Sequence, residues 1–243
     1  MHRALADAVK YKYISENPAD NCKLPKAQEP LVSVMKKDDL QKFLISAEKD
    51  EYCLLFLFAF ATGMRQGEIL GLTWDCIDFE AQSITIKQQL MKQHVKDGKY
   101  FLSSTKNKKS RVIQVPSIVI EKLKQQKIEQ NKYKELLDNM WSEEIPNLVF
   151  TQYDGTHLSH TTVYKHFKRI AESIGLPNAR FHDARHTYAV NSLLNGDQIN
   201  TVQKNMGHYS SSFTYDRYCH VLNEMQVESA NKMNDFLSGV IQQ

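Results

Sequence analysis

The chain has 243 residues, of which 42% are hydrophobic and 24% are charged, and its formal net charge at pH 7 is +3. This length allows a sizeable core, the apolar content is ordinary for a globular protein, and the mild charge alone does not indicate a nucleic-acid binder. The strongest apolar run, Tyr52–Ala61, is too short to cross a bilayer core of roughly 30 Å as a helix, and no signal segment opens the chain. We therefore expect a soluble, cytoplasmic protein.

The cysteines give no sign of a metal site. The four of them are scattered along the sequence as Cys22, Cys53, Cys76 and Cys219. They form no Cys-x-x-Cys pair, and they do not neighbour histidine at the spacing of zinc ligands. The simplest expectation is free thiols in a reducing compartment.

The first thirty residues are predicted to be separate from the rest. Arg3–Ile14 has a helical pattern but no core of its own, which is typical of the tail of another domain. Lys23–Pro30 is polar, has two prolines and shows no clear period, so it is predicted to be a linker. We expect a division into residues 1–30 and a main domain over residues 31–243.

The main domain is predicted to be mostly α-helical with a small antiparallel β-sheet, an α+β class. The helices are expected at Lys37–Ala47, Tyr52–Ala61 (fully buried), Gln66–Leu72, Ser117–Asn139 and, interrupted at glycines, Ser159–Phe236. A β-meander with lysine-rich turns is expected from Ser83–Leu90, Lys99–Leu102 and Arg111–Val115, with a further short strand at Leu148–Thr151.

Five residues with reactive or charged side chains suggest one chemistry. His182 and Arg185 are three positions apart, so they share one face of a helix. His208 follows a glycine, Tyr218 comes shortly after it, and Arg65 lies far upstream at the end of the apolar run. Two arginines, two histidines and a tyrosine suit the attack of a phenolic oxygen on a phosphodiester, which indicates an enzyme acting on DNA.

Each residue type has a physical reason to take part in this reaction. The planar guanidinium groups of Arg65 and Arg185 can grip the charged oxygens of a five-coordinate phosphorus. Glu68, at i+3 from Arg65, is expected to orient it. A tyrosine with a pKa near 10 needs help to become a nucleophile, so His182 is a candidate base. His208 is a candidate donor to the scissile phosphate.

The leaving 5′ oxygen needs a proton donor, and a lysine on a β-turn suits that task. The segment Thr105–Arg111 supplies three candidates, Lys106, Lys108 and Lys109. The residues alone do not choose among them.

Motifs along the chain resemble, in order, those of the tyrosine recombinase (phage integrase) family. They are Ala61–Leu72, Thr105–Pro116, Phe181–Thr187, Met206–Tyr209 and Thr214–Val221, and together they span most of residues 33–225. The sequences of Tyr209–Thr214, Tyr218–Val221 and the lysine-rich hairpin are most similar to those of integrases of conjugative transposons. The resemblance implies a tyrosine recombinase catalytic domain over residues 31–243, and it implies that residues 1–30 are the end of a core-binding domain with its linker.

The resemblance also assigns roles to individual residues. The activating set and the nucleophile become Arg65, Lys106, His182, Arg185, His208 and, as nucleophile, Tyr218. Lys108 stays an alternative to Lys106. Tyr209 and Tyr215 compete with Tyr218 on spacing alone, and the family pattern Tyr-x-His-Val selects Tyr218.

Further side chains are expected to contact DNA, since the lysine-rich hairpin lies close to the implied phosphate site. They are Lys92, Lys108, Lys109, Arg111 and His186. His186, like His220, is expected to be structural or to contact the surroundings of the phosphate.

The resemblance implies a covalent 3′-phosphotyrosine intermediate that needs no ATP, metal or other cofactor. The implied partners are double-stranded DNA at crossover sites, a homo-tetramer on DNA, and an accessory DNA-bending or excision factor. The helix Asn223–Phe236 is expected to dock either on a neighbouring subunit or on its own domain. The implied function is excision and insertion of a mobile element.

Other functions remain open at this point. A type IB topoisomerase or a chromosome-dimer resolving recombinase uses the same chemistry. A non-catalytic DNA-binding module would be expected to have lost some of the six active-site residues, which are all present. A metal-dependent nuclease would lose its activity in a chelator, whereas the chemistry described here would not.

Overall fold

The computed structural model describes residues 1–22, 33–93, 95, 98–105, 110–207 and 218, together with single positions between 230 and 240. The chain divides into two compact units, Met1–Leu31 and Val32–Gln243. This boundary lies one residue from the predicted one, while the nature of the first unit stays a prediction. The predicted linker over Lys23–Pro30 lies outside the described residues.

The first unit contains helix α1, His2–Lys10. This helix is shorter than predicted because Lys12 adopts a left-handed backbone, with φ of 61°, which does not continue an α-helix. The following turn is closed by Asn17, whose side-chain oxygen accepts a hydrogen bond from the backbone N–H of Ala19 at 3.0 Å.

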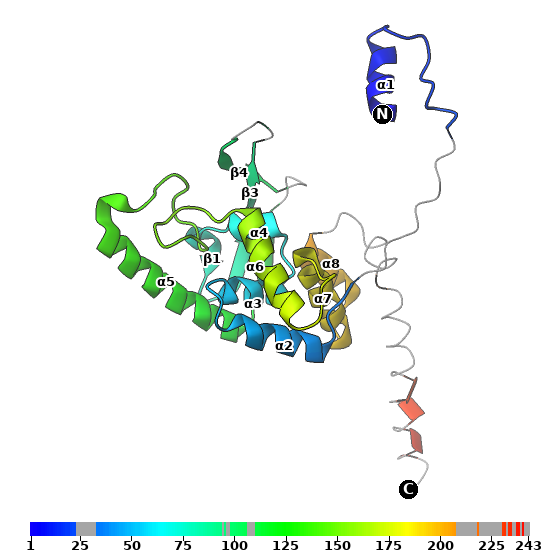
Figure 1. Cartoon of the computed structure of the whole chain (residues 1–243). Helices are drawn as coiled ribbons and strands as arrows, with labels where there is room; N and C mark the ends of the chain where they lie inside the picture. The colour runs from blue at the N-terminus through cyan, green and yellow to red at the C-terminus, as the bar shows by residue number, and fades with distance from the viewer. Residues whose placement is uncertain are drawn as a thin grey trace. The chain divides into compact units, whose positions relative to one another are not determined.

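The second unit is helical with small antiparallel sheets, so the predicted fold class is confirmed (Figure 1). In the described residues, its α-helices are α2 Lys37–Ala47, α3 Cys53–Thr62, α4 Gln66–Leu70, α5 Ser117–Leu137, α6 His160–Ser173, α7 Phe181–Leu194 and α8 Ile199–Met206. Short 3-10 helices lie at Trp74–Cys76 and Asp138–Met140. In the part of the chain that the structure describes, no helix is both long and apolar enough to span a membrane.

Helix α3 carries the centre of the core, with α2, α5 and α7 packed against it. Phe56 and Phe58 are completely buried, while Cys53 and Leu57 are half-buried, so the prediction of full burial holds for only part of the helix. Aromatic rings from neighbouring helices interlock here, with Phe43 of α2 at 5.7 Å from the ring of Phe56. Such edge-to-face contacts fix how the helices that carry the site pack together.

The strands form two separate sheets rather than one meander. They are β1 Ile77–Asp78, β2 Ser83–Ile86, β3 Gln88–Lys92, β4 Tyr100–Ser104 and β5 Arg111–Gln114. One antiparallel sheet has the order β1-β2-β5, and β3 pairs with β4 in the other. The predicted strand Ser83–Leu90 divides at Lys87, whose ammonium group pairs with Asp75 at 2.6 Å.

The predicted strand at Leu148–Thr151 is wrong. This segment makes only isolated bridges, Thr73 with Leu148 and Thr151 with His157. A side chain occupies the position of a neighbouring strand, because the amide of Gln130 on α5 donates to the carbonyl of Leu148 at 3.1 Å.

Candidate active site

The first turn of α7 positions three of the predicted site residues. Asp183 is completely buried and closes this turn, because its Oδ2 accepts from the backbone N–H of Arg180 at 2.8 Å and its Oδ1 accepts from the Arg180 guanidinium at 2.9 Å. A carboxylate at a helix N-terminus also interacts favourably with the helix dipole. The turn fixed in this way carries His182, and Arg185 and His186 follow it on the next turn of the helix.

Arg185 joins the ends of two other helices. Its Nη1 donates to the carbonyl of Gly63, the residue after α3, at 2.6 Å, and its Nη2 donates to the carbonyl of Met206 at the end of α8. Arg185 is 3% exposed, and its burial, together with the charge of Arg65, lowers its pKa to about 9. The group therefore stays positively charged at neutral pH while it is held away from solvent.

Arg65 stands at the start of α4 and contacts the partner that its spacing predicts. Its Nη1 donates to Oε1 of Glu68 at 2.8 Å, and its backbone N–H donates to Oε2 of the same carboxylate at 2.9 Å. A second guanidinium nitrogen, Nη2, donates to the carbonyl of Gly207 at 3.1 Å. The side chain of Arg65 is 27% exposed, so this arginine lies at the open side of the site.

Arg111 on β5 joins the same carboxylate from the other side. Its Nη1 and Nη2 donate to the two oxygens of Glu68 at 3.0 and 2.7 Å, and its Nε donates to the carbonyl of Asn205 at 2.8 Å. The sequence prediction placed Arg111 in contact with DNA and missed this ion pair. Arg111 and Glu68 are 43 positions apart, so no local spacing could have indicated it.

The carboxyl end of α8 receives all of these guanidinium groups. The carbonyls of Asn205, Met206 and Gly207 each accept a hydrogen bond from a different arginine. These carbonyls have no partner within the helix and lie at the negative end of its dipole, which favours positive charge there. We call Arg65, Arg111, Arg185 and Glu68 the arginine cluster; three cations and one carboxylate give it a formal charge of +2. Such a cluster is suited to binding a phosphate.

Tyr218 lies against α7 and α8 with its phenol withdrawn from solvent. Its exposed fraction is 0%, and its ring belongs to a buried cluster with Val190, Leu193, Val202 and Met206. The phenolic oxygen lies 2.7 Å from Nδ1 of His186. The sequence prediction gave the tyrosine His182 as its base, whereas the structure brings it next to His186, one residue beyond Arg185.

His182 adjoins this pair, with its ring centroid 5.0 Å from that of His186. Burial of the ring, together with the positive charge of Arg185, lowers the pKa of His182 below its usual 6.5. The imidazole is therefore neutral at pH 7, the state in which it can accept a proton.

Several predicted residues lie outside the described part of the chain. They are Lys106, Lys108, Lys109, His208, the competing Tyr209 and Tyr215, and His220. Most of the predicted helix Asn223–Phe236 lies outside it as well. Lys92, at the end of β3, is exposed, and its ammonium group lies 5.8 Å from the ring centroid of Tyr100.

Among the described residues, no three His, Cys, Asp or Glu side chains lie close enough together to hold a metal ion. The cysteines that the structure describes, Cys22, Cys53 and Cys76, are free thiols.

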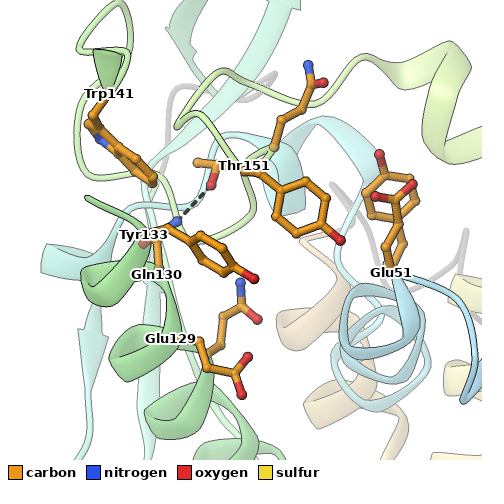
Figure 2. A pocket seen from close by; sticks show the side chains of 10 residues that line it. Glu51, Glu129, Gln130, Tyr133, Trp141 and Thr151 are labelled. Atoms are coloured by element: carbon orange, nitrogen blue, oxygen red, sulfur yellow. Dashed lines mark hydrogen bonds between the residues drawn. The ribbon is translucent and has the colours of Figure 1, made fainter. Parts of the chain in front are cut away.

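A cavity of about 240 Å³ lies away from the arginine cluster and shares no residue with it (Figure 2). Its lining consists of Glu51, Tyr52, Gln126, Glu129, Gln130, Tyr133, Trp141, Thr151, Gln152 and Tyr153. Among them, Gln130 donates to the hydroxyl of Thr151 at 2.9 Å. These contacts fasten α5 to the segment that follows it, which is a structural role.

The family model described as the phage integrase family matches residues 33–225. The chain belongs to the phage integrase family. This membership confirms the resemblance seen in the motifs, and the matched residues include every predicted catalytic position.

Curated relatives extend this assignment. A "Tyrosine recombinase XerC-like" protein of Caldanaerobacter subterraneus subsp. tengcongensis is 28% identical, over 94% of this chain and 62% of the relative. The "ICEBs1 integrase" of Bacillus subtilis is 25% identical, over 95% of this chain and 62% of the relative. The chain thus spans about three fifths of the length of these relatives.

Solved structures of the family share the fold. The Tn1549 transposon integrase in complex with a circular intermediate DNA superposes with a TM-score of 0.73 at 20% identity, over 89% of this chain and 71% of that one. The XerH site-specific recombinase bound to palindromic difH substrate gives a TM-score of 0.63 at 22% identity, over 90% of this chain and 59% of that one.

Proposed function

We propose that this chain is a site-specific DNA recombinase that cleaves and rejoins DNA through a covalent 3′-phosphotyrosine at Tyr218. The observation that carries the proposal is the position of the Tyr218 phenol, 2.7 Å from His186 on the helix that also presents Arg185. A tyrosine, two histidines and a cationic cluster adjoining the same helix ends meet the needs of phosphoryl transfer to a phenol.

The proposed cleavage step is balanced without any further reactant. The phenolic oxygen of Tyr218 forms a bond to phosphorus while the bond from phosphorus to the 5′ oxygen breaks. The phenol proton passes to an imidazole, for which His182 and His186 are the candidates on α7. A proton from a lysine, Lys106 or its alternative Lys108, completes the 5′-hydroxyl. Arg65, Arg185 and His208 are assigned to the phosphate oxygens.

Ligation reverses these bonds with the 5′-hydroxyl of a second strand. Because the phosphotyrosine keeps the energy of the broken ester, the reaction needs no ATP. It also needs no metal ion, since guanidinium groups supply the positive charge at the phosphate.

The proposed biological role is excision and insertion of a mobile element. The similarity to an ICEBs1 integrase and to a Tn1549 transposon integrase supports this role. Chromosome-dimer resolution, the alternative that the sequence left open, is the second candidate. An assay that scores excision of a circle against resolution of a dimer separates the two roles.

The proposed partners are double-stranded DNA and further copies of the same chain. The neighbouring structures are complexes of recombinases with DNA, which supports DNA as the ligand. We further propose a homo-tetramer on DNA, exchange of the helix Asn223–Phe236 between subunits, and an accessory DNA-bending or excision factor. Residues 1–30 are proposed to be the end of a core-binding domain, and the cytoplasm is proposed as the place of action.

The test is covalent capture. The chain is incubated with a nicked suicide duplex that carries a candidate crossover site, in the presence of a chelator. We expect an adduct that survives denaturing electrophoresis and whose DNA-linked peptide contains Tyr218. Since Tyr218→Phe lacks only the nucleophilic oxygen, it should lose the adduct while its DNA affinity stays close to that of the wild type.

Tyr215→Phe and Tyr209→Phe are the matched controls, because each removes a hydroxyl from a competing tyrosine. Both should still form the adduct. An adduct formed by Tyr218→Phe, or lost in Tyr215→Phe, contradicts the assignment of the nucleophile. Strand cleavage that depends on a divalent metal contradicts the proposed chemistry altogether.

A further inference from the structure

The contacts of Arg111 differ from those of a side chain that meets DNA. All three nitrogens of its guanidinium donate to protein acceptors, two to the carboxylate of Glu68 and one to the carbonyl of Asn205. Its side chain is 13% exposed, about half the exposed fraction of Arg65. The geometry indicates a group that faces the interior of the site.

We propose that Arg111 is a positioning residue, which keeps Arg65 and the carboxyl end of α8 in their working arrangement by sharing Glu68 and holding Asn205. This inference rests on the proposed recombinase function, because Arg65 is one of the groups that this function assigns to the phosphate. Arg111 itself touches neither the nucleophile nor, in this inference, the phosphate.

The charge on Arg65 depends on how the negative charge of Glu68 is shared. Glu68 is almost completely buried, with a side chain 1% exposed, and it is the carboxylate shared by Arg65 and Arg111. With both arginines in place, one negative charge is divided between two cations, so Arg65 keeps much of its attraction for a phosphate. Without Arg111, Glu68 would neutralise Arg65 alone, and the formal charge of the cluster would fall from +2 to +1.

The ionisation of Glu68 agrees with a carboxylate that is shared by two arginines. Burial by itself raises the pKa of this carboxyl group, but the hydrogen bonds and the charge of Arg111, joined by those of Arg65, outweigh it and hold the pKa below its usual 4.5. The carboxylate is therefore ionised at neutral pH and requires both cations.

The position of Arg111 in the fold supports the same role. Arg111 begins β5, which is fixed in register by the pairing of Ile86 with Arg111 and of Ile84 with Ile113. The side chain thus extends from a rigid sheet to the end of α8. A Cβ on Gly207 would lie 2.9 Å from Nη1 of Arg111, so the guanidinium packs directly on the residue that precedes His208 in the sequence. A rigid support of this kind is what a preorganised site requires.

The experiment compares Arg111→Gln, Arg111→Lys and the wild-type chain in two DNA measurements. The first is the rate of covalent adduct formation at saturating suicide duplex, and the second is the slope of log affinity against log salt concentration. We expect Arg111→Gln to form the adduct about 10- to 100-fold more slowly, as for other supporting residues of an active site. The salt slope should not change, because no phosphate contact is lost.

Arg111→Lys keeps the charge but loses the planar fork, so its rate should lie between those of the other two proteins. The matched control is Arg169→Gln, which also removes a guanidinium from a buried carboxylate, here Asp50 at 2.7 Å, but lies outside the cluster. This control should cleave at the wild-type rate. If circular dichroism shows that Arg111→Gln is unfolded, the rate of adduct formation and the salt slope of Arg111→Lys test the inference instead.

A different pattern overturns the inference. If the salt slope of Arg111→Gln becomes shallower by about 0.9 while the rate at saturation stays at the wild-type value, Arg111 contacts a phosphate instead. A third measurement does not depend on catalysis: the pKa of Glu68, followed by NMR of carbon-13 labelled glutamate, should rise in Arg111→Gln. If the wild type forms no adduct, the proposed function fails, and an unchanged Glu68 pKa would then separately overturn the inference.

Discussion

The phenolic oxygen of Tyr218 lies 2.7 Å from Nδ1 of His186, and the tyrosine has an exposed fraction of 0%. A phosphodiester in duplex DNA cannot reach a phenol in this position. In the proposed reaction, Tyr218 must therefore leave the side chains of α7 and α8 before its oxygen can attack. The contact with His186 then belongs to a resting arrangement, in which the phenol lies beside the imidazole groups that the proposal assigns to its activation.

This contact predicts energetic coupling between the two residues. His186→Ala and Tyr218→Phe should each destabilise the chain, but the double variant should lose less than the sum, by about 0.5–1.5 kcal/mol, because the same hydrogen bond is removed once. Urea denaturation of the four proteins measures the coupling. His166→Ala is the matched control, since its ring pairs with Asp50 instead, at 2.9 Å, and its effect should add to that of Tyr218→Phe. Additivity for His186 as well would contradict the contact.

A second prediction concerns Gly63, which follows α3 and lends its carbonyl to Arg185. Its φ of +60° is unfavourable for other residues, and a Cβ there would lie 2.3 Å from the ring of Tyr188. Gly63→Ala should therefore lose about 1–2 kcal/mol from the backbone and about 1–3 kcal/mol more from the overlap. Because the carbonyl would move away from Arg185, adduct formation should slow as well.

Gly175→Ala separates the two contributions. Gly175 also has a positive φ, +83°, but nothing lies within 4 Å of a Cβ built there. It should show the backbone loss alone, with an unchanged rate of adduct formation. Equal losses of stability for the two variants, measured in urea, would mean that Tyr188 moves aside without cost.

A third prediction concerns pH. The pKa of His182 is lowered below 6.5 by burial, by Arg185 and, more weakly, by other cations that include Arg65. Its imidazole should thus titrate below pH 6.5 in an NMR titration, with the signal assigned by loss in His182→Gln. Arg65→Gln should move the titration upward, since it removes one of the repelling charges. A titration of the wild type at or above 6.5 would contradict the neutral base.

The lowered pKa of His182 also makes the stability of the folded chain depend on pH, in a direction that follows from the sign of the shift. Between the folded pKa and about 6.5, the unfolded chain binds this proton more readily than the folded chain does. The contribution of His182 to the free energy of unfolding therefore falls as the pH is lowered through 6.5. In His182→Gln this part of the pH dependence should be absent.

Comparison of sequence and structure shows which relationships local patterns can predict. Helix α2 has the predicted bounds, Lys37–Ala47, because an acidic first turn and a helical period both lie within the segment. The pair of Arg65 with Glu68 was predictable because positions three apart meet on one helical turn. These are short-range relationships.

Long-range contacts were not predictable in this way. Arg111 meets Glu68 across 43 positions, and the phenol of Tyr218 meets His186 across 32. The motifs predict which residues belong to the site. Which of these residues contact one another depends on how β5, α4, α7 and α8 pack together. The wrong strand at Leu148–Thr151 has a similar cause, because a side chain from α5 takes the carbonyl that a neighbouring strand would otherwise bind.

The last prediction concerns that side chain. The amide oxygen of Gln130 accepts from the indole of Trp74 at 2.6 Å, and its nitrogen donates to the carbonyl of Leu148 at 3.1 Å. The same nitrogen donates to the hydroxyl of Thr151 at 2.9 Å (Figure 2). Gln130→Met keeps the size of the side chain but removes these hydrogen bonds, so we expect a loss of about 2–4 kcal/mol in urea denaturation.

Gln130→Glu is the matched control, because it keeps an acceptor for Trp74 and loses only the donors. This variant should be destabilised by the loss of the hydrogen bonds to Leu148 and Thr151 and by the burial of a charge. Its stability should recover when the carboxyl group is protonated at low pH. Since these contacts lie outside the arginine cluster, both variants should form the adduct at the wild-type rate wherever they are folded. A slower rate in a folded variant would mean that the attachment of α5 affects the geometry of the site.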